Sequence, residues 1–286
     1  MNRCKAFLES LKPGVGAAAL IHRPENIRWL TGYTGEGCAF VSMDAQVIIT
    51  DFRYVEQAGR QAPEARVVRY DANRPMLAEL KALLQAQGAE KLAVEEDDMT
   101  VASYRRMKEA LDGVELTAAH GETEELRLVK DEGEIEMIAK ACAISCAAFD
   151  KMLGVMKAGM TEKEIQLELD YTMLRLGGDG LAFDTIACAG VNGSLPHAIP
   201  GDHVVQEGEL LTLDFGATYG GYCADMTRTV AFGKISDALR DIYDAVLKAQ
   251  LMSLDMVGPG VVCRDVDRCA RDYLDSKYPG AFGHSL

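Results

Sequence analysis

The feature that most constrains the fold is the stretch LLTLDFGATYGGYCADMTRT at residues 210–229. Two apolar, strand-like runs flank a glycine turn, which predicts an antiparallel hairpin. Asp214 lies in the first run and Asp225 in the second. A turn centred on residues 219–220 places the two aspartates directly opposite each other, and a turn centred on residues 220–221 makes them diagonal neighbours. Unless a bulge or an odd-length loop intervenes, both carboxylates lie on one face of the hairpin.

Two carboxylates about 5 Å apart at Cβ repel each other, and no Lys or Arg faces either one in the predicted ladder. Three arrangements relieve the repulsion. One carboxyl is protonated, as in a carboxylate dyad; a hard cation lies between the two; or one aspartate lies at the solvent end of the hairpin and faces water. The hairpin pattern alone leaves all three open.

Composition narrows the class of protein. A chain of 286 residues with 48% hydrophobic residues can build one large or two ordinary domains with a real core. The net charge of -14 argues against a nucleic-acid partner, which would need a basic face. The N-terminus lacks an apolar signal segment and no run is long enough to span a membrane, so we expect a soluble, cytoplasmic protein. The eight cysteines are scattered without a Cys-x-x-Cys motif, which argues against a zinc knuckle or a redox pair.

The first part of the chain alternates short β-type runs with helical periodicity, which predicts a compact α/β domain over residues 1–121. A charged segment then leads into a second domain, residues 122–286. The predicted strands are 16–22, 37–43, 45–51, 65–71 and 91–97, and the predicted helices are 76–88 and 100–111.

The second domain begins with two predicted helices, and the same plan recurs about a hundred residues later. The first helix carries an apolar stripe at Ile135, Ile138, Cys142, Cys146, Phe149, Leu153 and Met156. Thr161 and Glu164 form a capping box for the second helix. A further helix over 236–256 and another through Val266 and Leu274 repeat this order, and AGMTEKEI aligns with PGVVCRDV without a gap. We therefore predict an α+β fold whose second domain contains duplicated units of a helix pair and an antiparallel sheet.

His197 ends a loop that directly precedes the hairpin. A histidine placed there, near acidic side chains, can donate a proton or contact a substrate. The alternative is an exposed loop histidine, which is our interpretation of His203 beside Asp202.

Three motifs together carry a family resemblance: FDTIACAGVNGSLPHA at 183–198, LTLDFGATYGGYCADMTRT at 211–229 and the terminal FGHSL. They resemble the catalytic domain of the pita-bread metallopeptidases, in the Xaa-Pro aminopeptidase and prolidase branch. NIRWLTGYTGEG and VIITDFRYVEQA resemble the smaller, creatinase-like domain that precedes it in these enzymes. The resemblance covers nearly the whole chain.

The resemblance implies a role for each matching residue. Asp214 and Asp225 match two aspartates that ligate a pair of divalent metal ions, with Asp225 bridging both. His197 matches an active-site histidine that contacts the substrate or the reaction intermediate. His284 matches a histidine that lines the site without being a ligand, and Thr227 would support the ligands from behind, although a plain strand threonine is the alternative.

The resemblance also implies a reaction. Two ions, with Mn²⁺ expected first and Co²⁺ or Zn²⁺ as alternatives, would activate a bridging water to cleave Xaa-Pro bonds in proline-containing peptides. It further implies a homodimer. The remaining ligands of the family, one His and two Glu, fall after Leu286, so we expect the 286-residue chain to be a C-terminally truncated, inactive piece of a longer enzyme. The competing interpretations are a non-catalytic pita-bread binding protein and a metal-free amidinohydrolase of the creatinase type; the retained aspartate pair counts against both.

Overall fold

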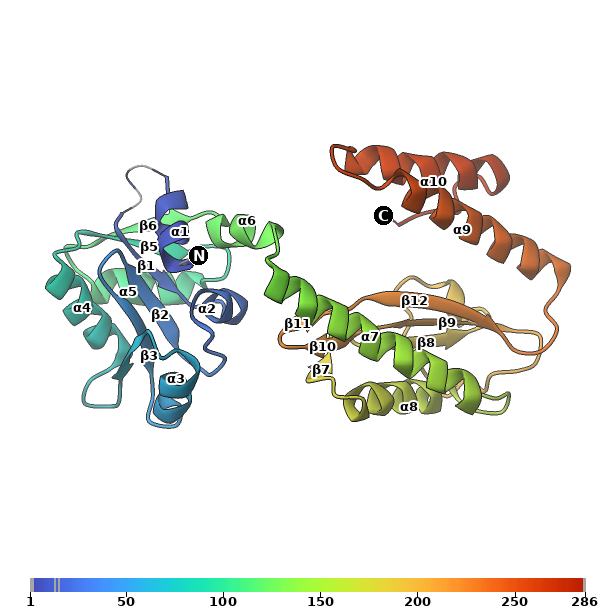
Figure 1. Ribbon diagram of the computed structural model, residues 1–286, viewed down its shortest axis with the longest axis horizontal. Helices are drawn as coiled ribbons and strands as arrows, with labels where there is room; N and C mark the ends of the chain where they lie inside the picture. Colours follow the sequence, from blue (N-terminus) through green and yellow to red (C-terminus); the bar gives the residue numbers. More distant parts are fainter. Residues whose placement is uncertain (1–2, 13, 15, 285–286) are drawn as a thin grey trace. The chain divides into compact units, whose positions relative to one another are not determined.

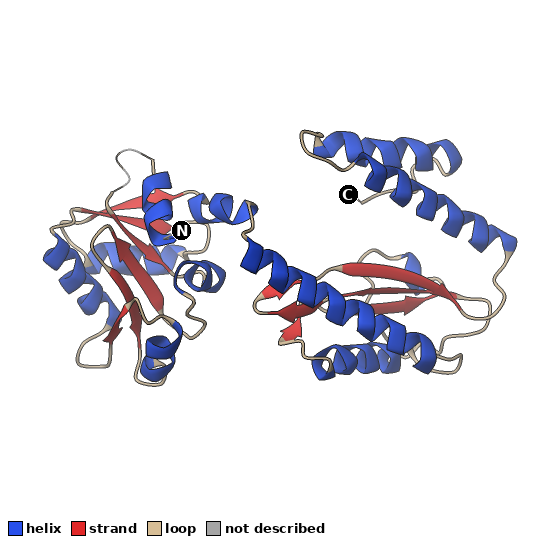
Figure 2. Ribbon diagram, viewed as in Figure 1, coloured by secondary structure: helices blue, strands red, loops and turns tan. Residues whose placement is uncertain are grey.

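The computed structural model describes residues 3–12, 14 and 16–284. The chain divides into two compact units, Met1–Asp131 and Glu132–Leu286 (Figure 1). The sequence placed the domain boundary between residues 121 and 122. The short helix α6 (Glu122–Leu128) accounts for the difference, because its Leu126 packs against a core cluster of the first unit. Both units combine helices and strands, which confirms the predicted α+β class (Figure 2).

In the first unit, six strands of the described chain form one mixed sheet in the order β4-β3-β2-β1-β5-β6. The central strand β1 pairs antiparallel with β2 and parallel with β5. The first five strands lie within the predicted ranges, whereas β6 was not predicted. The strands are β1 (Ala18–Ile21), β2 (Cys38–Ser42), β3 (Gln46–Thr50), β4 (Arg66–Arg69), β5 (Lys91–Glu95) and β6 (Glu115–Ala119).

Helices cover both faces of this sheet, so its central strands are apolar on both sides. Side chains alternate along β1: Ala19 and Ile21 join the cluster with Phe7 and Trp29, and Leu20 faces the opposite cluster with Leu84. The predicted helices 76–88 and 100–111 are present as α4 and α5. The helices of the unit are α1 (Arg3–Ser10), α2 (Pro24–Thr31), α3 (Val55–Gln61), α4 (Met76–Gln87), α5 (Val101–Ala110) and α6.

The second unit is built around the predicted hairpin, which takes part in two small sheets, β12-β9-β8 and β11-β10-β7. Helices α7 and α8 pack along these strands, and α9 and α10 form a separate pair (Figure 1). The strands are β7 (Gly180–Leu181), β8 (Ile186–Ala189), β9 (Leu210–Phe215), β10 (Ala217–Tyr219), β11 (Tyr222–Cys223) and β12 (Met226–Ala231). The helices are α7 (Glu132–Val155), α8 (Glu162–Arg175), α9 (Asp237–Met256), α10 (Cys263–Lys277) and the 3₁₀ turn η1 (Asn192–Ser194).

The structure corrects the predicted buried face of α7. Its most buried side chains are Glu134, Ala141, Ser145, Ala148 and Met152, whereas Ile135 and Leu153 of the predicted stripe are about half exposed. Small residues face the strands because the helix lies close to them. The buried polar side chains of α7 accept hydrogen bonds from the hairpin. The Ser145 hydroxyl accepts the N–H of Ala217 at 3.0 Å, and Glu134 accepts the hydroxyl of Tyr222 at 2.7 Å.

The other predicted helix features of the second unit are present. The Thr161–Glu164 capping box begins α8, with the Glu164 N–H donating to the Thr161 hydroxyl and Glu164 accepting the N–H of Thr161. The second helix pair packs through Ala245, Ala249 and Ala270. In the part of the chain described here, no helix is both long and apolar enough to cross a membrane.

Candidate metal centre

The register of the hairpin decides how the two aspartates face each other. Asp214 pairs with Thr227, and Thr218 pairs with Cys223, so the turn is centred on Gly220 and Gly221. Both turn glycines have positive φ, 57° and 78°, as a two-residue hairpin turn of this kind requires. In this register Asp225 is the diagonal neighbour of Asp214, because it lies two residues before Thr227, and both aspartates are on the same face of the hairpin.

The hairpin is interrupted at the level of the aspartates, between its two paired segments. A Cβ at Gly216 would lie 1.8 Å from the carbonyl oxygen of Ala224, so the two backbones approach too closely there for any side chain. Asp225 is the next residue after Ala224 and lies outside the named strands. The close backbone approach therefore sets the position of one carboxylate relative to the other.

Asp214 is half-buried and is poorly supplied with hydrogen-bond donors. Its Oδ1 accepts the Thr227 hydroxyl at 2.9 Å. Burial raises the pKa of the Asp214 carboxyl above its usual range, and the neighbouring Asp225 carboxylate raises the pKa further. The Thr227 hydroxyl and the nearby His197 oppose that rise without cancelling it. The ionised form of Asp214 is thus under-stabilised by its protein surroundings.

The two predicted histidines lie together, and His197 is near enough to Asp214 to affect the pKa of its carboxyl. The imidazole rings of His197 and His284 are 6.0 Å apart between centroids, edge to face. His197 lies on an exposed loop after η1, and the backbone carbonyl of His284 accepts the Arg271 guanidinium at 3.0 Å. Asp214, Thr227 and His197 therefore lie near one another, in the same unit as Asp225 and His284. Residues 285 and 286 of the terminal motif lie outside the described residues.

The donor set fits a divalent cation in part. Two carboxylates on one face supply hard oxygen ligands, and within the described residues no ion pair joins Asp214 or Asp225 to a Lys or Arg. A cation is the group that would relieve both the repulsion and the raised pKa of Asp214. Across residues 3–12, 14 and 16–284, however, no group of three or more His, Cys, Asp or Glu side chains is arranged to hold an ion. The described chain supplies part of a ligand set.

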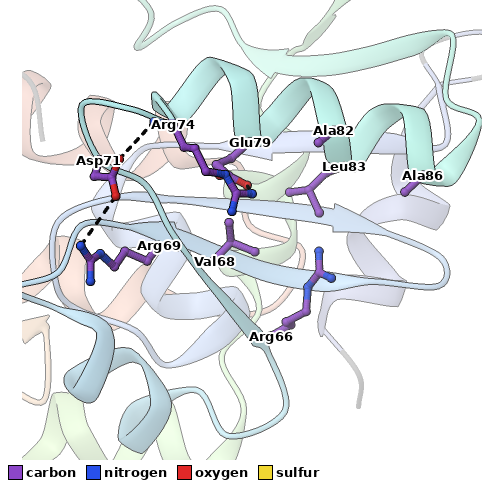
Figure 3. A pocket seen from close by; sticks show the side chains of 9 residues that line it. All are labelled: Arg66, Val68, Arg69, Asp71, Arg74, Glu79, Ala82, Leu83 and Ala86. Atoms are coloured by element: carbon purple, nitrogen blue, oxygen red, sulfur yellow. Dashed lines mark hydrogen bonds and ion pairs between the residues drawn. The ribbon is translucent and has the colours of Figure 1, made fainter.

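A hollow of about 600 Å³ lies elsewhere, in the first unit between β4 and α4 (Figure 3). Its charged side chains are Arg66, Arg69, Arg74, Asp71 and Glu79. Acids neutralise much of that charge, because Arg74 Nε lies 2.6 Å from Glu79 and Arg69 lies 3.7 Å from Asp71. All the predicted site residues belong to the second unit, so none of them lines this hollow.

Sequence reasoning missed Glu162, the first residue of α8. Its carboxylate is fully buried and binds the loop that carries His197. A glutamate in the first turn of a helix is common, because it complements the helix dipole. The residue type and its position therefore gave no signal of a long-range role.

Comparison with known proteins assigns the chain to a family. The model of metallopeptidase family M24 matches residues 136–286, and the model of the creatinase/prolidase N-terminal domain matches residues 3–129. The chain belongs to metallopeptidase family M24, joined to a creatinase/prolidase N-terminal domain, as the sequence motifs indicated.

Relatives and solved structures agree with this assignment. The chain is 37% identical over 268 residues to an uncharacterised peptidase, YqhT, of Bacillus subtilis, covering 93% of this chain and 75% of the relative. It is similar to the Xaa-Pro dipeptidase from Bacillus anthracis, with a TM-score of 0.94, 35% identity and coverage of 99% and 79%. It is also similar to the X-Pro aminopeptidase from Thermotoga maritima, with a TM-score of 0.88, 37% identity and coverage of 95% and 78%.

Proposed function

We propose that this protein is a metal-dependent peptidase that cleaves Xaa-Pro bonds, with Asp214 and Asp225 as ligands of a dinuclear divalent metal site. The observation that carries the proposal is the aspartate pair itself. Two carboxylates share one face of a hairpin, and the pKa of Asp214 is raised by burial and by Asp225. The solved relatives named as an Xaa-Pro dipeptidase and an X-Pro aminopeptidase supply the substrate class.

The proposal gives the other site residues positioning roles. Thr227 would orient Asp214 through the 2.9 Å hydrogen bond to its Oδ1. His197 and His284, with rings 6.0 Å apart, would contact the peptide at its scissile carbonyl and donate hydrogen bonds to it. When bound, divalent ions supply an activated water and Lewis-acid polarisation of that carbonyl. We favour Mn²⁺, with Co²⁺ or Zn²⁺ as alternatives, because carboxylate oxygens suit hard cations.

The substrate preference has a physical basis in the peptide bond. Proline's amide nitrogen carries no hydrogen, so the site must accept a tertiary amide. Recognition then depends on the ring and on the free amino end of the peptide. The prolidase from Pyrococcus horikoshii, matched at a TM-score of 0.90 with 25% identity, is a further solved relative with a name of this class.

Residues 1–286 alone are expected to hold metal weakly and to show no turnover, because the described part of the chain brings no third ligand to the pair. A site of two carboxylates leaves most coordination positions of each ion to water. Efficient hydrolysis by residues 1–286 would contradict this expectation. We also propose a homodimer, on the family resemblance, which sedimentation of the purified protein tests, and a cytoplasmic location, which cell fractionation tests.

The test is hydrolysis of an Xaa-Pro dipeptide by the protein that the gene encodes, after chelation and again after addition of Mn²⁺ or Co²⁺. Activity restored by metal and lost in Asp225→Asn supports the proposal. A protein that stays inactive with every divalent ion, or an Asp225→Asn variant with full activity, would favour a non-catalytic binding protein. Hydrolysis of an amidino substrate in the presence of EDTA would instead favour the creatinase-type reaction.

A further inference from the structure

Most of the apolar side chains in the loop that carries His197 are exposed, with Ala198 as a small buried exception. His197 is exposed, and two of its apolar neighbours, Val191 and Ile199, are 90% and 83% exposed. The loop runs between β8 and the bridge that pairs Val204 with Thr161. Hydrophobic burial therefore does little to fix the conformation of this segment, and polar contacts must supply the restraint.

Those contacts converge on Glu162. Its side chain is fully buried, and its carboxylate accepts the backbone N–H of Ala189 at 2.7 Å, the Asn192 amide at 2.8 Å and the backbone N–H of Gly201 at 3.0 Å. Ala189 and Asn192 precede His197, and Gly201 follows it. The Asn192 amide also lies 3.4 Å from the carbonyl of Ile199. The buried Glu162 carboxylate thus binds the loop at positions before and after His197 in the sequence.

The backbone around Glu162 reinforces this binding. The N–H of Glu162 donates to the carbonyl of His203 at 3.0 Å, and the N–H of Lys163 donates to the carbonyl of Gly201 at 3.1 Å. The first N–H groups of a helix have no partner inside the helix, so α8 uses them to hold the returning end of the loop. Glu164, two residues further on, has a different task, because it accepts the N–H of Thr161 within the cap of its own helix.

We propose that Glu162 is the positioning residue for His197, holding the loop of residues 190–203 in the conformation that presents the imidazole to the aspartate pair. The inference rests on the proposed function for the role of His197, whereas the restraint of the loop is independent of it. A carboxylate suits this task because both of its oxygens accept hydrogen bonds, and it receives three donors here. A glutamine of the same shape would turn an NH₂ group toward some of those donors.

The first experiment measures amide hydrogen exchange in the 286-residue protein and its variants, with no metal or substrate required. In Glu162→Gln we expect exchange across residues 189–203 to rise about tenfold or more, because a buried bonding network loses its acceptor. Glu164→Gln is the matched control, since it changes a carboxylate in the same helix turn. We expect it to speed exchange at the start of α8 and to leave residues 189–203 as in the wild type.

Asn192→Ala keeps the test decisive if Glu162→Gln does not fold. This variant retains the buried carboxylate and removes only the exposed-loop side chain that joins it to Ile199. We expect a smaller rise in exchange, limited to the segment around His197. Unchanged exchange across residues 189–203 in folded Glu162→Gln or in Asn192→Ala, or an equal rise in Glu164→Gln, would overturn the proposal.

A spectroscopic readout separates positioning from general stability. The protein has five histidines, so the imidazole signals of His197 can be assigned by comparison with His197→Gln. In Glu162→Gln these signals should move toward those of an unstructured histidine, while those of His22 and His120 in the first unit stay in place. Wild-type His197 signals in Glu162→Gln would contradict the proposal.

Binding of an Ala-Pro dipeptide in the presence of Mn²⁺, by the protein that the gene encodes and its Glu162→Gln variant, then separates the positioning role from the proposed function. If wild-type protein binds the dipeptide and Glu162→Gln binds it several-fold more weakly, both the proposed function and the positioning role are supported. If wild type does not bind it but the exchange and imidazole effects are present, the proposed function fails and the restraint by Glu162 stands. If both proteins bind equally and the imidazole signals are unchanged, the positioning role fails.

Discussion

Glu95 in the first unit and Asp214 in the second are carboxylates with opposite surroundings. Glu95, at the end of β5 in the first unit, accepts the backbone N–H groups of His22 and Arg23 at 2.7 and 2.8 Å and the Asn26 amide at 2.6 Å. These donors lie at the start of α2, whose N-cap residue has no side-chain cap of its own. Asp214 in the second unit accepts one hydroxyl and lies beside a second carboxylate, Asp225.

The difference shows which acids stabilise the fold by themselves. A carboxylate with several N–H donors satisfies donors that burial would otherwise leave unpaired. Glu95 and Glu162 are both of this kind. Within the described residues, Asp214 and Asp225 have no such set of N–H donors. We therefore expect that removal of the Glu95 carboxylate destabilises the first unit, whereas removal of the Asp214 carboxylate does not destabilise the second.

The largest expected effect is at Glu95. Glu95→Ala leaves two backbone N–H groups without their acceptor and removes one of the two acceptors of the Asn26 amide, which also donates to Glu124, so we expect the first unit to lose about 3 kcal/mol of stability. The only tryptophan of the chain, Trp29, is buried in this unit, and its fluorescence during denaturation reports the loss.

Glu96→Ala is the control, because Glu96 is exposed and pairs with the exposed His120 at 2.7 Å. We expect that substitution to change the stability of the first unit by less than about 0.5 kcal/mol. If Glu95→Ala changed the stability of the first unit as little as Glu96→Ala does, the number of N–H donors around a carboxylate would not determine its contribution to stability.

The next effect concerns metal at the aspartate pair. At a Mn²⁺ concentration ten times the dissociation constant, binding to the folded form should stabilise the second unit by about 1.4 kcal/mol. Asp214→Asn should abolish this gain, and without metal it should leave the second unit at least as stable at neutral pH, because the repulsion with Asp225 is gone. Hydrogen exchange of the β9 amides with and without Mn²⁺ measures both results.

Asp202→Asn provides the matched control, since Asp202 is an exposed aspartate of the same unit outside the pair. It should respond to Mn²⁺ as the wild type does. Equal stabilisation of the wild type and Asp214→Asn by Mn²⁺ would place the ion elsewhere.

Patterns of apolar residues, capping residues and turn residues in the sequence predicted most of the strands and helices. Five strands of the first unit and the helices α4, α5, α8, α9 and α10 follow from periodicity and capping signals. The hairpin pattern narrowed the relation of the two aspartates to two registers, and the structure adopts the one centred on Gly220 and Gly221. That register places glycine at both central positions of the turn, and both adopt positive φ.

The failures have a common physical cause, since each depends on a partner distant in sequence. The apolar stripe of α7 was read as its buried face, but the helix packs closely on the hairpin through Ala141, Ser145 and Ala148. Ser145 faces inward because it supplies an acceptor to the N–H of Ala217. Glu162 was missed for the same reason: its three donors are 27 to 39 residues away along the chain.

The smallest effect tests how Thr227 acts on Asp214. The folded-state pKa of Asp214 is raised above its ordinary value, so the folded protein binds this proton more tightly than the unfolded chain does. Stability from this group therefore falls as pH rises from the ordinary value through the raised pKa. The Thr227 hydroxyl opposes the rise, and Thr227→Val should raise the pKa further and extend the loss to higher pH.

We expect Thr227→Val to cost about 0.5 kcal/mol at pH 7 in EDTA and less at a pH below the ordinary value of an aspartate, where the raised pKa keeps the Asp214 carboxyl mostly protonated and the lost bond is no longer charge-assisted. Exchange of the β9 amides at the two pH values measures the difference. Thr229→Val is the control: its hydroxyl lies 3.4 Å from that of Thr212, a neutral pair, so its cost should not depend on pH. An equal cost of Thr227→Val at both pH values would mean that Thr227 supports the strand pairing and not the charge of Asp214.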